Sequence, residues 1–390
     1  QSTWHRISLS ALLFNNLGCH NGLLAAYYRS GTVYSNLFWL WNGFIALGIY
    51  EDHVKIIPIT LLAIVGLMAL CLAATTLLAG EANCDQSTHA LKTETILAVG
   101  HRGAAGLKPE NTLIGFSRAI ELGVHAIELD VLVTADNVLV VHHDFSLKPE
   151  IARLPDGARL NDYTGTQINQ LTVDQLKSFD VGRLKPHTRY ASRYPDQIPS
   201  DGQRIPTLRE VIQLIKKSSP KPVQLWIEIK TSPEQPSKTP APERVAEDIV
   251  NLLKEENVTQ GVKVLSFDWR SLIHIQKIAP SIPTVYLSSE TKQFKAASFM
   301  NPWESEWTAG FDIGTYGGSI PRTIKAAGGC WWGPKYTQIT AEQVDMAHRL
   351  GVNVAVWTPD KKRHLVKMIK LGVDAIITNR PDRLLYIMGK

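Results

Sequence analysis

The chain has 390 residues, of which 44% are hydrophobic and 20% charged, enough for one large domain and something smaller. Basic residues exceed acidic ones by only five and form no run, which excludes nucleic acid as an expected partner. The cysteines (Cys19, Cys71, Cys84 and Cys330) are far apart in the sequence. Their spacing predicts neither a metal-binding motif nor a disulfide framework, and it leaves the cellular compartment open.

Residues 56–80 contain no charged side chain (IIPITLLAIVGLMALCLAATTLLAG). A helix rises about 1.5 Å per residue, so this segment can cross a hydrocarbon layer of about 30 Å with some tilt. Pro58 lies in the expected first turn, where proline is tolerated. We therefore predict a transmembrane helix over residues 56–80, since the segment is too long and too far from residue 1 for a cleaved signal peptide.

A second uncharged run covers residues 30–50 and has Trp39, Trp41 and Tyr50 near its ends, as aromatic residues are placed at membrane interfaces. This pattern predicts a second span. Residues 7–28 are as consistent with an interfacial helix as with a span. So much apolar sequence exceeds what one anchor needs, which also suggests docking to a membrane-protein partner.

The basic residues Arg6, Arg29 and Lys55 precede the predicted helix, whereas the segment after it has no lysine or arginine before Lys92. By the positive-inside bias the helix runs outward from the cytoplasm. We therefore expect a membrane-anchored protein whose large domain lies on the non-cytoplasmic side. The resulting organisation is a membrane region over residues 1–80, a polar linker over residues 81–95 and one large domain over residues 96–390.

The large domain opens with apolar segments that predict strands near residues 98–99, 126–129 and 138–141. Residues 111–122 have helical spacing, and Gly123 suits the C-cap of that helix. A strand, a helix and a strand in this order predict parallel strands whose carboxyl ends share one ligand-binding edge. Ionisable residues follow each strand: His101 and Arg102, then Glu128 and Asp130, then His142, His143 and Asp144.

Strand and helix patterns continue to alternate, about eight times in all, which predicts a (β/α)₈ barrel. The further strands are expected near residues 223–229, 262–265, 284–287, 310–313, 352–357 and 375–378, and the further helices near residues 208–217, 243–256, 270–278, 340–350 and 362–371. Thr207 and Glu210 have the spacing of a capping box at the first of these helices. Residues 145–205 lack periodicity and are too long for an ordinary loop, so they form either an inserted subdomain or a functional lid.

Three acids lie at predicted strand ends. Glu128 and Asp130 are two positions apart on one strand and so face the same way, and Glu228 lies at the end of the strand over residues 223–229. Carboxylates around one point repel each other unless a cation neutralises them, and oxygen ligands select Mg²⁺ or Ca²⁺ over zinc. Arg102 and Lys230 offer the competing interpretation, in which the acids form salt bridges only.

Histidine titrates near neutrality, so His101 and His143 suit paired general acid and base catalysis. Strand alternation places His142 on the face opposite His143. Arg102 offers a two-pronged donor and Lys230 a point charge where a phosphate group would bind. Together these groups predict metal-assisted cleavage of a phosphodiester.

The motifs occur in a fixed order: His101-Arg102-Gly103, Pro109-Glu110-Asn111-Thr112, Glu128-Leu129-Asp130 and His143-Asp144. On these motifs, and over residues 96–385, the chain resembles the glycerophosphodiester phosphodiesterase family. The resemblance implies a TIM barrel with an insertion over about residues 145–205, and it selects His143, which precedes Asp144, over His142. Glu110 is then expected behind the site, and Asn111 as a cap of the following helix.

The same resemblance implies that Glu128, Asp130 and Glu228 ligate one divalent cation, that His101 and His143 are catalytic, and that Trp357 covers the substrate. It further implies release of glycerol 3-phosphate and an alcohol, after a glycerol hydroxyl of the substrate has formed a cyclic phosphate. The residues alone leave direct attack by water equally open.

Two other functions remain in view. A lysophospholipase D would act on bilayer lipids by the same chemistry, and an apolar groove beside Trp331, Trp332 and Trp357 would favour it. A sphingomyelinase-D-like activity fits poorly with the long insertion. A non-catalytic subunit of a membrane complex would retain the barrel as a scaffold, yet every candidate site residue is present.

Overall fold

The computed structural model describes residues 96–154, 156–158, 160, 165–218, 222–289 and 306–390. The predicted transmembrane helix over residues 56–80, the second run over residues 30–50 and the linker over residues 81–95 lie outside these residues. In the described part of the chain, no helix combines the length and the apolar character that crossing a membrane requires.

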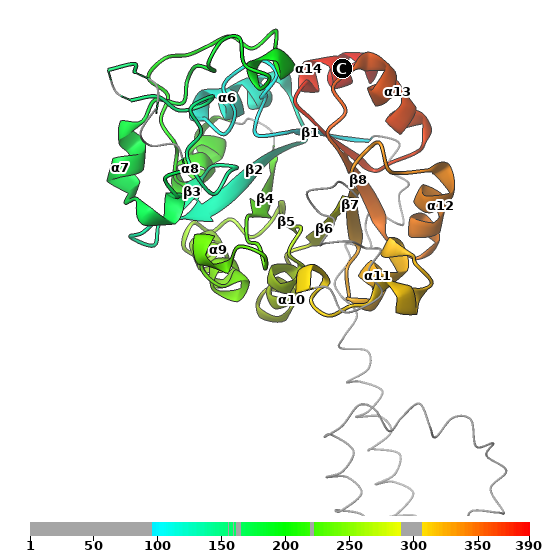
Figure 1. Ribbon diagram of the computed structural model, residues 1–390. Helices are drawn as coiled ribbons and strands as arrows, with labels where there is room; N and C mark the ends of the chain where they lie inside the picture. The colour runs from blue at the N-terminus through cyan, green and yellow to red at the C-terminus, as the bar shows by residue number, and fades with distance from the viewer. Residues whose placement is uncertain (1–95, 155, 159, 161–164, 219–221, 290–305) are drawn as a thin grey trace, which may run out of the picture. The chain divides into compact units, whose positions relative to one another are not determined.

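Eight parallel strands close into a barrel, as the sequence predicted (Figure 1). The first strand pairs with both the second and the last strand of the ring, which completes the closure. The barrel strands are β1 (Leu97–Gly100), β2 (Ala126–Val133), β4 (Gln224–Ile229), β5 (Val262–Ser266), β6 (Thr284–Ser288), β7 (Trp331–Pro334), β8 (Asn353–Trp357) and β9 (Ala375–Thr378). Each strand is almost fully buried. One of its faces packs against other side chains inside the barrel, and the helices cover the other face.

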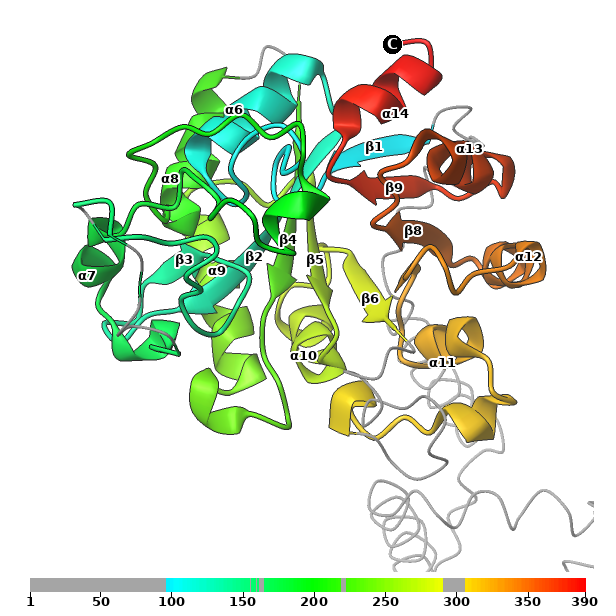
Figure 2. The same ribbon diagram turned by 45° about the horizontal axis from the view of Figure 1, so that its top comes forward.

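Helices follow the barrel strands and lie around their outside (Figure 2). They are α6 (Leu113–Leu122), α8 (Leu208–Ser218), α9 (Pro242–Glu255), α10 (Trp269–Ile278), α11 (Ile320–Ala326), α12 (Ala341–Arg349), α13 (Lys362–Lys370) and α14 (Pro381–Ile387). Helix α6 ends at Gly123, which has a φ of 83° and caps the helix in the left-handed region, as predicted. The capping box of α8 is also present, because Thr207 and Glu210 each accept a hydrogen bond from the other's backbone amide.

Packed aromatic side chains fill the barrel interior. Trp226 of β4 and Trp331 of β7 meet edge to face, with ring centroids 5.6 Å apart. Trp332 points to the helical layer instead, and its indole nitrogen donates to Ser288 Oγ at 2.8 Å. Trp331 and Trp332 are only 5% and 1% exposed, so they belong to the core and do not line an open groove.

One predicted strand is wrong. Residues 310–313 form no strand: Ala309 and Gly310 have φ values of 53° and 82°, and the short 3₁₀ helix η6 (Ile313–Tyr316) begins within the range. The barrel strand in this part of the chain is β7, with the sequence WWGP. Its glycine and proline are unusual in a strand, so the sequence pattern does not predict it. A Cβ at Gly333 would lie 2.5 Å from Leu287 Cδ2, so a larger residue there would require the Leu287 side chain to move.

The third predicted strand, β3 (Leu139–Val141), is antiparallel to β2 and lies outside the barrel ring. After it, residues 145–205 run to α8 and include η1 (Ile168–Gln170), α7 (Val173–Ser178) and η2 (Ala191–Arg193). Their apolar side chains, among them Leu147, Leu176 and Phe179, cluster separately from the barrel core. We refer to residues 145–205 as the insertion; α7 lies beside β3 and α8 (Figure 1).

Candidate active site

Three buried carboxylates gather at the carboxyl-terminal mouth of the barrel. Glu128 and Asp130 lie on β2, and Glu228 on β4 is the register partner of Asp130. One oxygen atom of each carboxylate lies within 4.8 Å of the others, an arrangement that could hold a metal ion. The two acids of β2 lie inside the strand and not at its end as expected, because pairing with β3 extends β2 to Val133.

Two cations contact this carboxylate cluster. Arg102 Nε lies 3.2 Å from Asp130 Oδ2, and Lys230 Nζ lies 2.7 Å from Glu228 Oε1 and 3.6 Å from Asp130 Oδ1. Because acids surround both groups, the pKa of Arg102 and that of Lys230 are raised, although burial alone would lower them. Both cations therefore stay charged at neutral pH.

The His-Arg-Gly motif bends the backbone into the site. Arg102 has a φ of 50°, a strained value for a residue with a side chain, and its backbone amide donates to Glu128 Oε2 at 3.0 Å. Gly103 has a φ of 86°, and a Cβ there would lie 2.7 Å from the Gly115 backbone of α6. Only glycine fits this close approach, which explains the third position of the motif.

Burial and mutual repulsion perturb the three acids. Burial, and then the charges of Asp130 and Glu228, raise the pKa of Glu128 well above its usual value. Burial also raises the pKa of Glu228 to about 7. Burial would raise the pKa of Asp130 too, but His143, Arg102 and Lys230 outweigh burial and leave it below the usual value. Ionising all three carboxylates together is therefore unfavourable in the absence of a further positive charge.

The two cations do not suffice to neutralise the buried acids. If Glu110, Glu128, Asp130 and Glu228 were all ionised, they would exceed Arg102 and Lys230 by two negative charges, which is why the pKa values of Glu128 and Glu228 are raised. Asp130 Oδ1 is buried and accepts no hydrogen bond, and neither does the buried Oδ1 of Asn111. Buried polar atoms normally have partners, so unsatisfied oxygen atoms beside excess negative charge fit one divalent cation with oxygen ligands.

His101 follows β1 and is held from β9, the neighbouring strand of the barrel. Its Nδ1 lies 2.6 Å from Asn379 Oδ1, at the end of β9, and its Nε2 lies 3.9 Å from Glu128 Oε2. Asn379 in turn donates from Nδ2 to Asp360 Oδ2 at 2.8 Å. Burial, and next the charge of Arg102, lower the pKa of His101 to about 3, so the ring is neutral. No sequence motif marks Asn379 or Asp360 as site residues; the position of Asn379 directly after the last strand is the available signal.

His143 is held differently from His101. Its Nδ1 lies 3.1 Å from Asp144 Oδ1, a carboxylate that also pairs with Lys148 at 2.6 Å. Burial, and then Arg102 and Lys230, lower the pKa of His143. His142 is 5% exposed, and its backbone amide donates to the Asp130 carbonyl, so it is packed beneath the site.

The Pro-Glu-Asn-Thr motif contributes two buried side chains to the site. Glu110 Oε1 accepts from Arg102 Nη1 at 2.8 Å. Asn111 was expected to cap α6, but Thr112 is the N-cap, and Asn111 Nδ2 donates to Asp130 Oδ2 at 2.9 Å instead. The φ of 52° at Asn111 explains this difference, since an N-cap residue has extended backbone.

Trp357 lies at the end of β8, on the rim of the barrel. Its indole nitrogen donates to the Gly333 carbonyl at 2.9 Å, and its ring packs edge to face against Phe267 at 5.6 Å. These contacts fix the ring as part of the wall. No hydrogen bond, ion pair or ring contact joins Trp357 to the carboxylate cluster among the described residues.

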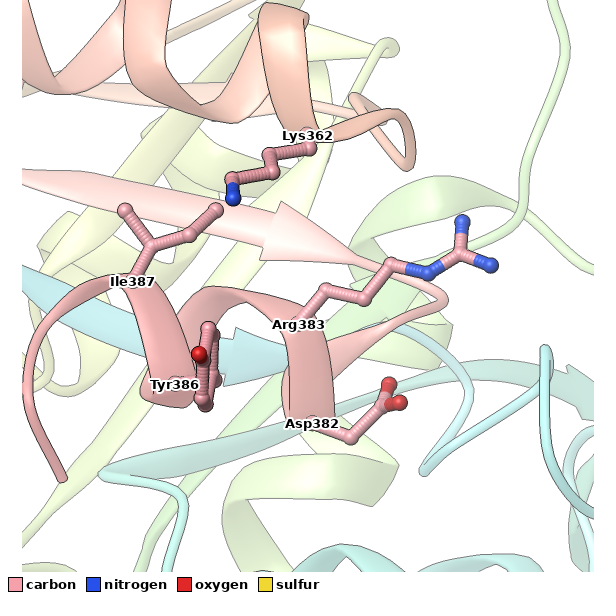
Figure 3. A pocket seen from close by; sticks show the side chains of 5 residues that line it. All are labelled: Lys362, Asp382, Arg383, Tyr386 and Ile387. Carbon is pink, nitrogen blue, oxygen red and sulfur yellow. The ribbon is translucent and has the colours of Figure 1, made fainter.

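A pocket of about 400 Å³ lies away from these groups, between α13 and α14. Figure 3 shows the residues that line it, which are Lys362 at the start of α13 and Asp382, Arg383, Tyr386 and Ile387 on α14. Arg383 donates to the Asp360 carbonyl and forms an ion pair with Asp196, which binds the insertion to α14. This pocket therefore has no part in the chemistry of the barrel mouth.

Comparisons with known proteins agree with this geometry. The family model of the glycerophosphoryl diester phosphodiesterase family matches residues 101–383. A glycerophosphodiester phosphodiesterase of Caldanaerobacter subterraneus is 30% identical, over 75% of this chain and 98% of the relative. A Silicibacter pomeroyi structure assigned to the same family has 31% identity and a TM-score of 0.67, covering 76% of this chain and 95% of its own.

An Oleispira antarctica phosphodiesterase, solved in complex with the product sn-glycerol-3-phosphate, has a TM-score of 0.54, with 75% of this chain and 97% of that chain covered. At 20% identity this likeness speaks for the fold alone. The fold and the site together define a TIM-barrel hydrolase with an acidic cluster at its mouth. With the family match, the chain belongs to the glycerophosphoryl diester phosphodiesterase family and is a phosphoric diester hydrolase.

Proposed function

We propose that this protein hydrolyses glycerophosphodiesters to an alcohol and sn-glycerol 3-phosphate with the help of one divalent cation, Mg²⁺ or Ca²⁺. The observation that carries the proposal is the cluster of Glu128, Asp130 and Glu228, with carboxylate oxygens within 4.8 Å, between two cations and two histidines. A phosphodiester carries one negative charge, so a bound metal cation and the positively charged side chains of Arg102 and Lys230 would both attract it.

Glu128, Asp130 and Glu228 would hold the cation, with the buried Oδ1 of Asn111 as a further oxygen nearby. When bound, the cation would supply Lewis-acid stabilisation of charge on the phosphoryl oxygens. Arg102 Nε and Nη1 already contact acids, whereas Nη2 has no hydrogen-bond partner among the described residues. Arg102 Nη2 and the Lys230 ammonium group would bind the non-bridging phosphate oxygens.

The hydrogen bonds of the two histidines support different roles. His101 donates from Nδ1 to Asn379, which leaves Nε2 unprotonated and able to take the proton of the attacking hydroxyl group. His143 has the Asp144 carboxylate at Nδ1, which favours its protonated form and offsets part of the lowering of its pKa by burial, Arg102 and Lys230. As the attacking oxygen bonds to phosphorus and the bond to the leaving alcohol breaks, His143 gives a proton to that alcohol.

The attacking group is a glycerol hydroxyl of the substrate or a water molecule. A glycerol hydroxyl would give a cyclic phosphate that water opens in a second step, in which the two histidines exchange roles. Trp357 would cover the glycerol part of the substrate from the rim.

A lysophospholipase D remains the related alternative, but the apolar groove that would favour it is not formed by Trp331 and Trp332, which are buried. A non-catalytic scaffold would tolerate loss of the candidate site residues, and none of them is lost.

We also propose that residues 56–80 anchor the protein in a membrane with the barrel on the non-cytoplasmic side, as their uncharged run suggests. Extraction of the full chain from membranes by alkali, without detergent, would contradict anchoring.

The test is release of glycerol 3-phosphate from glycerophosphocholine by the full chain, with Mg²⁺ or Ca²⁺ and with a chelator. We expect turnover that requires the cation and falls at least 100-fold in His101→Ala and in His143→Ala. Turnover of lysophosphatidylcholine but not of glycerophosphocholine would favour the lysophospholipase D alternative. A folded, cation-binding protein that turns over neither substrate would contradict the proposal.

A further inference from the structure

One segment of the insertion reaches the phosphate-binding end of the proposed site. The Tyr190 hydroxyl group makes a short hydrogen bond to Glu110 Oε2 and lies 3.4 Å from Arg102 Nη1. The other oxygen of the same carboxylate, Glu110 Oε1, accepts from Arg102 Nη1 at 2.8 Å. Glu110 thus joins an arginine of the barrel mouth to a tyrosine that lies 88 residues later in the sequence.

The direction of the hydrogen bond between Tyr190 and Glu110 follows from the environment. Burial, and then the charge of Glu110, raise the pKa of Tyr190 far above its usual value, so the phenol keeps its proton and donates. Glu110 is 5% exposed and accepts from both sides. Its carboxylate is therefore fully engaged in holding Arg102 and Tyr190.

The insertion is fastened to the barrel next to this contact. Gln197 Nε2 donates to the Ala105 carbonyl at 2.7 Å, and the Ile198 amide donates to the Leu107 carbonyl at 2.9 Å. Asp196 forms ion pairs with Arg380 and Arg383 at the start of α14. Tyr190 is thus presented to Arg102 by a segment with several independent attachments, which fixes its position.

We propose that Tyr190 is a positioning residue for phosphate recognition, acting through Glu110 to fix the Arg102 guanidinium group with Nη2 left for the substrate. The proposal rests on the proposed function, in which Arg102 binds the phosphate. An arginine side chain has many rotamers, and fixing it before binding lowers the entropic cost of the complex. The insertion would then set substrate affinity without touching the reacting atoms.

The test compares Tyr190→Phe with the wild-type full chain. Phenylalanine keeps the ring and its contact with Tyr194 and removes only the hydroxyl group. We expect the KM for glycerophosphocholine to rise about 5- to 10-fold with kcat within about twofold, because Arg102 contacts the phosphate in both the ground state and the transition state. Tyr386→Phe, at a tyrosine that is 77% exposed, is the matched control and should change neither constant.

A double-mutant cycle tests the route through Glu110. Glu110→Gln should also raise KM, and Tyr190→Phe should add little in the Glu110→Gln background, because the two residues act in one chain of contacts. An unchanged KM in a folded Tyr190→Phe protein would overturn the proposal, and so would fully additive effects, since a merely structural role lowers the melting temperature and leaves KM alone.

Calorimetry with inorganic phosphate separates this inference from the proposed function. If the wild type binds phosphate but turns over no glycerophosphodiester, the proposed function fails. A 5- to 10-fold weaker phosphate affinity of Tyr190→Phe would then still support the positioning role. An equal affinity of both proteins would overturn it.

Discussion

Asn379 orients the side chain of His101. His101 Nδ1 lies 2.6 Å from Asn379 Oδ1, and Asn379 Nδ2 donates to Asp360 Oδ2 at 2.8 Å. A carboxylate can only accept, so it fixes which end of the amide is the donor. The amide oxygen therefore faces the imidazole, and His101 must carry its proton on Nδ1. This relationship between β9 and β1 determines which nitrogen of His101 can act as a base.

Removing the support of His101 should impair turnover without removing the histidine. We expect Asn379→Ala and Asp360→Ala each to lower kcat about 10- to 100-fold, because the imidazole can then rotate or change tautomer. Steady-state kinetics with glycerophosphocholine measure the effect. Asn251→Ala, at an exposed amide on α9, is the control and should leave kcat unchanged. A wild-type kcat in both site variants would show that the tautomer of His101 does not matter.

Binding of a divalent cation should stabilise the fold. An ion at 100 times its Kd adds about 2.7 kcal/mol to the free energy of unfolding, a rise in melting temperature of about 4–5 °C for a domain of about 300 residues. Glu228→Gln should lose most of that rise, whereas Glu121→Gln, an exposed acid on α6, should keep it. Differential scanning calorimetry with Ca²⁺, Mg²⁺ and chelator checks this. An equal rise in the Glu228→Gln protein would place the ion elsewhere.

The barrel could be predicted from the sequence because alternating strands and helices leave a strong periodic signal, and most strands occur where the pattern indicated. The exception, β7, has two tryptophans that face opposite layers of the barrel, so neither alternation nor a smooth apolar run marked it. Local spacing also placed Glu128 and Asp130 on one face. Contacts between distant segments, such as Tyr190 with Glu110 and Asn379 with His101, have no local signature, because only the folded topology brings them together.

Asp180 should make the stability of the insertion depend on pH. Burial would raise its pKa, but the amides of Gly202 and Gly182, each at 2.8 Å, and the Arg153 guanidinium group outweigh burial and lower it. A lowered pKa in the folded state means that the carboxylate stabilises fully above the unfolded value of about 3.9. That contribution is lost as the pH falls through the folded pKa.

We therefore expect Asp180→Asn to lower the free energy of unfolding by about 1–3 kcal/mol at pH 7, and the gap from the wild type to narrow below about pH 4. Urea unfolding at pH 7 and pH 3 measures both values. Asp345→Asn on α12 removes an exposed ion pair and should change the free energy by less than about 0.5 kcal/mol at either pH. A gap that stays constant down to pH 3 would assign the effect of Asp180→Asn to something other than its charge.

The roles of the two histidines can be separated by changing the leaving group. A general acid matters when the departing alcohol must be protonated, and hardly at all when the leaving group is a nitrophenol, which departs as a stable anion. We expect His143→Ala to lose about 10²- to 10⁴-fold in kcat with glycerophosphocholine but only about tenfold with the nitrophenyl diester of glycerol phosphate.

His101→Ala should lose a similar factor with both substrates, because the base acts on the attacking hydroxyl group in each case. His274→Ala, which removes a hydrogen bond between α10 and Glu247 of α9, should affect neither substrate. Recovery of His101→Ala instead of His143→Ala with the nitrophenyl substrate would exchange the two assignments. Equal losses in both variants with both substrates would mean that protonation of the leaving group depends on neither histidine alone, contrary to the distinct partners Asn379 and Asp144.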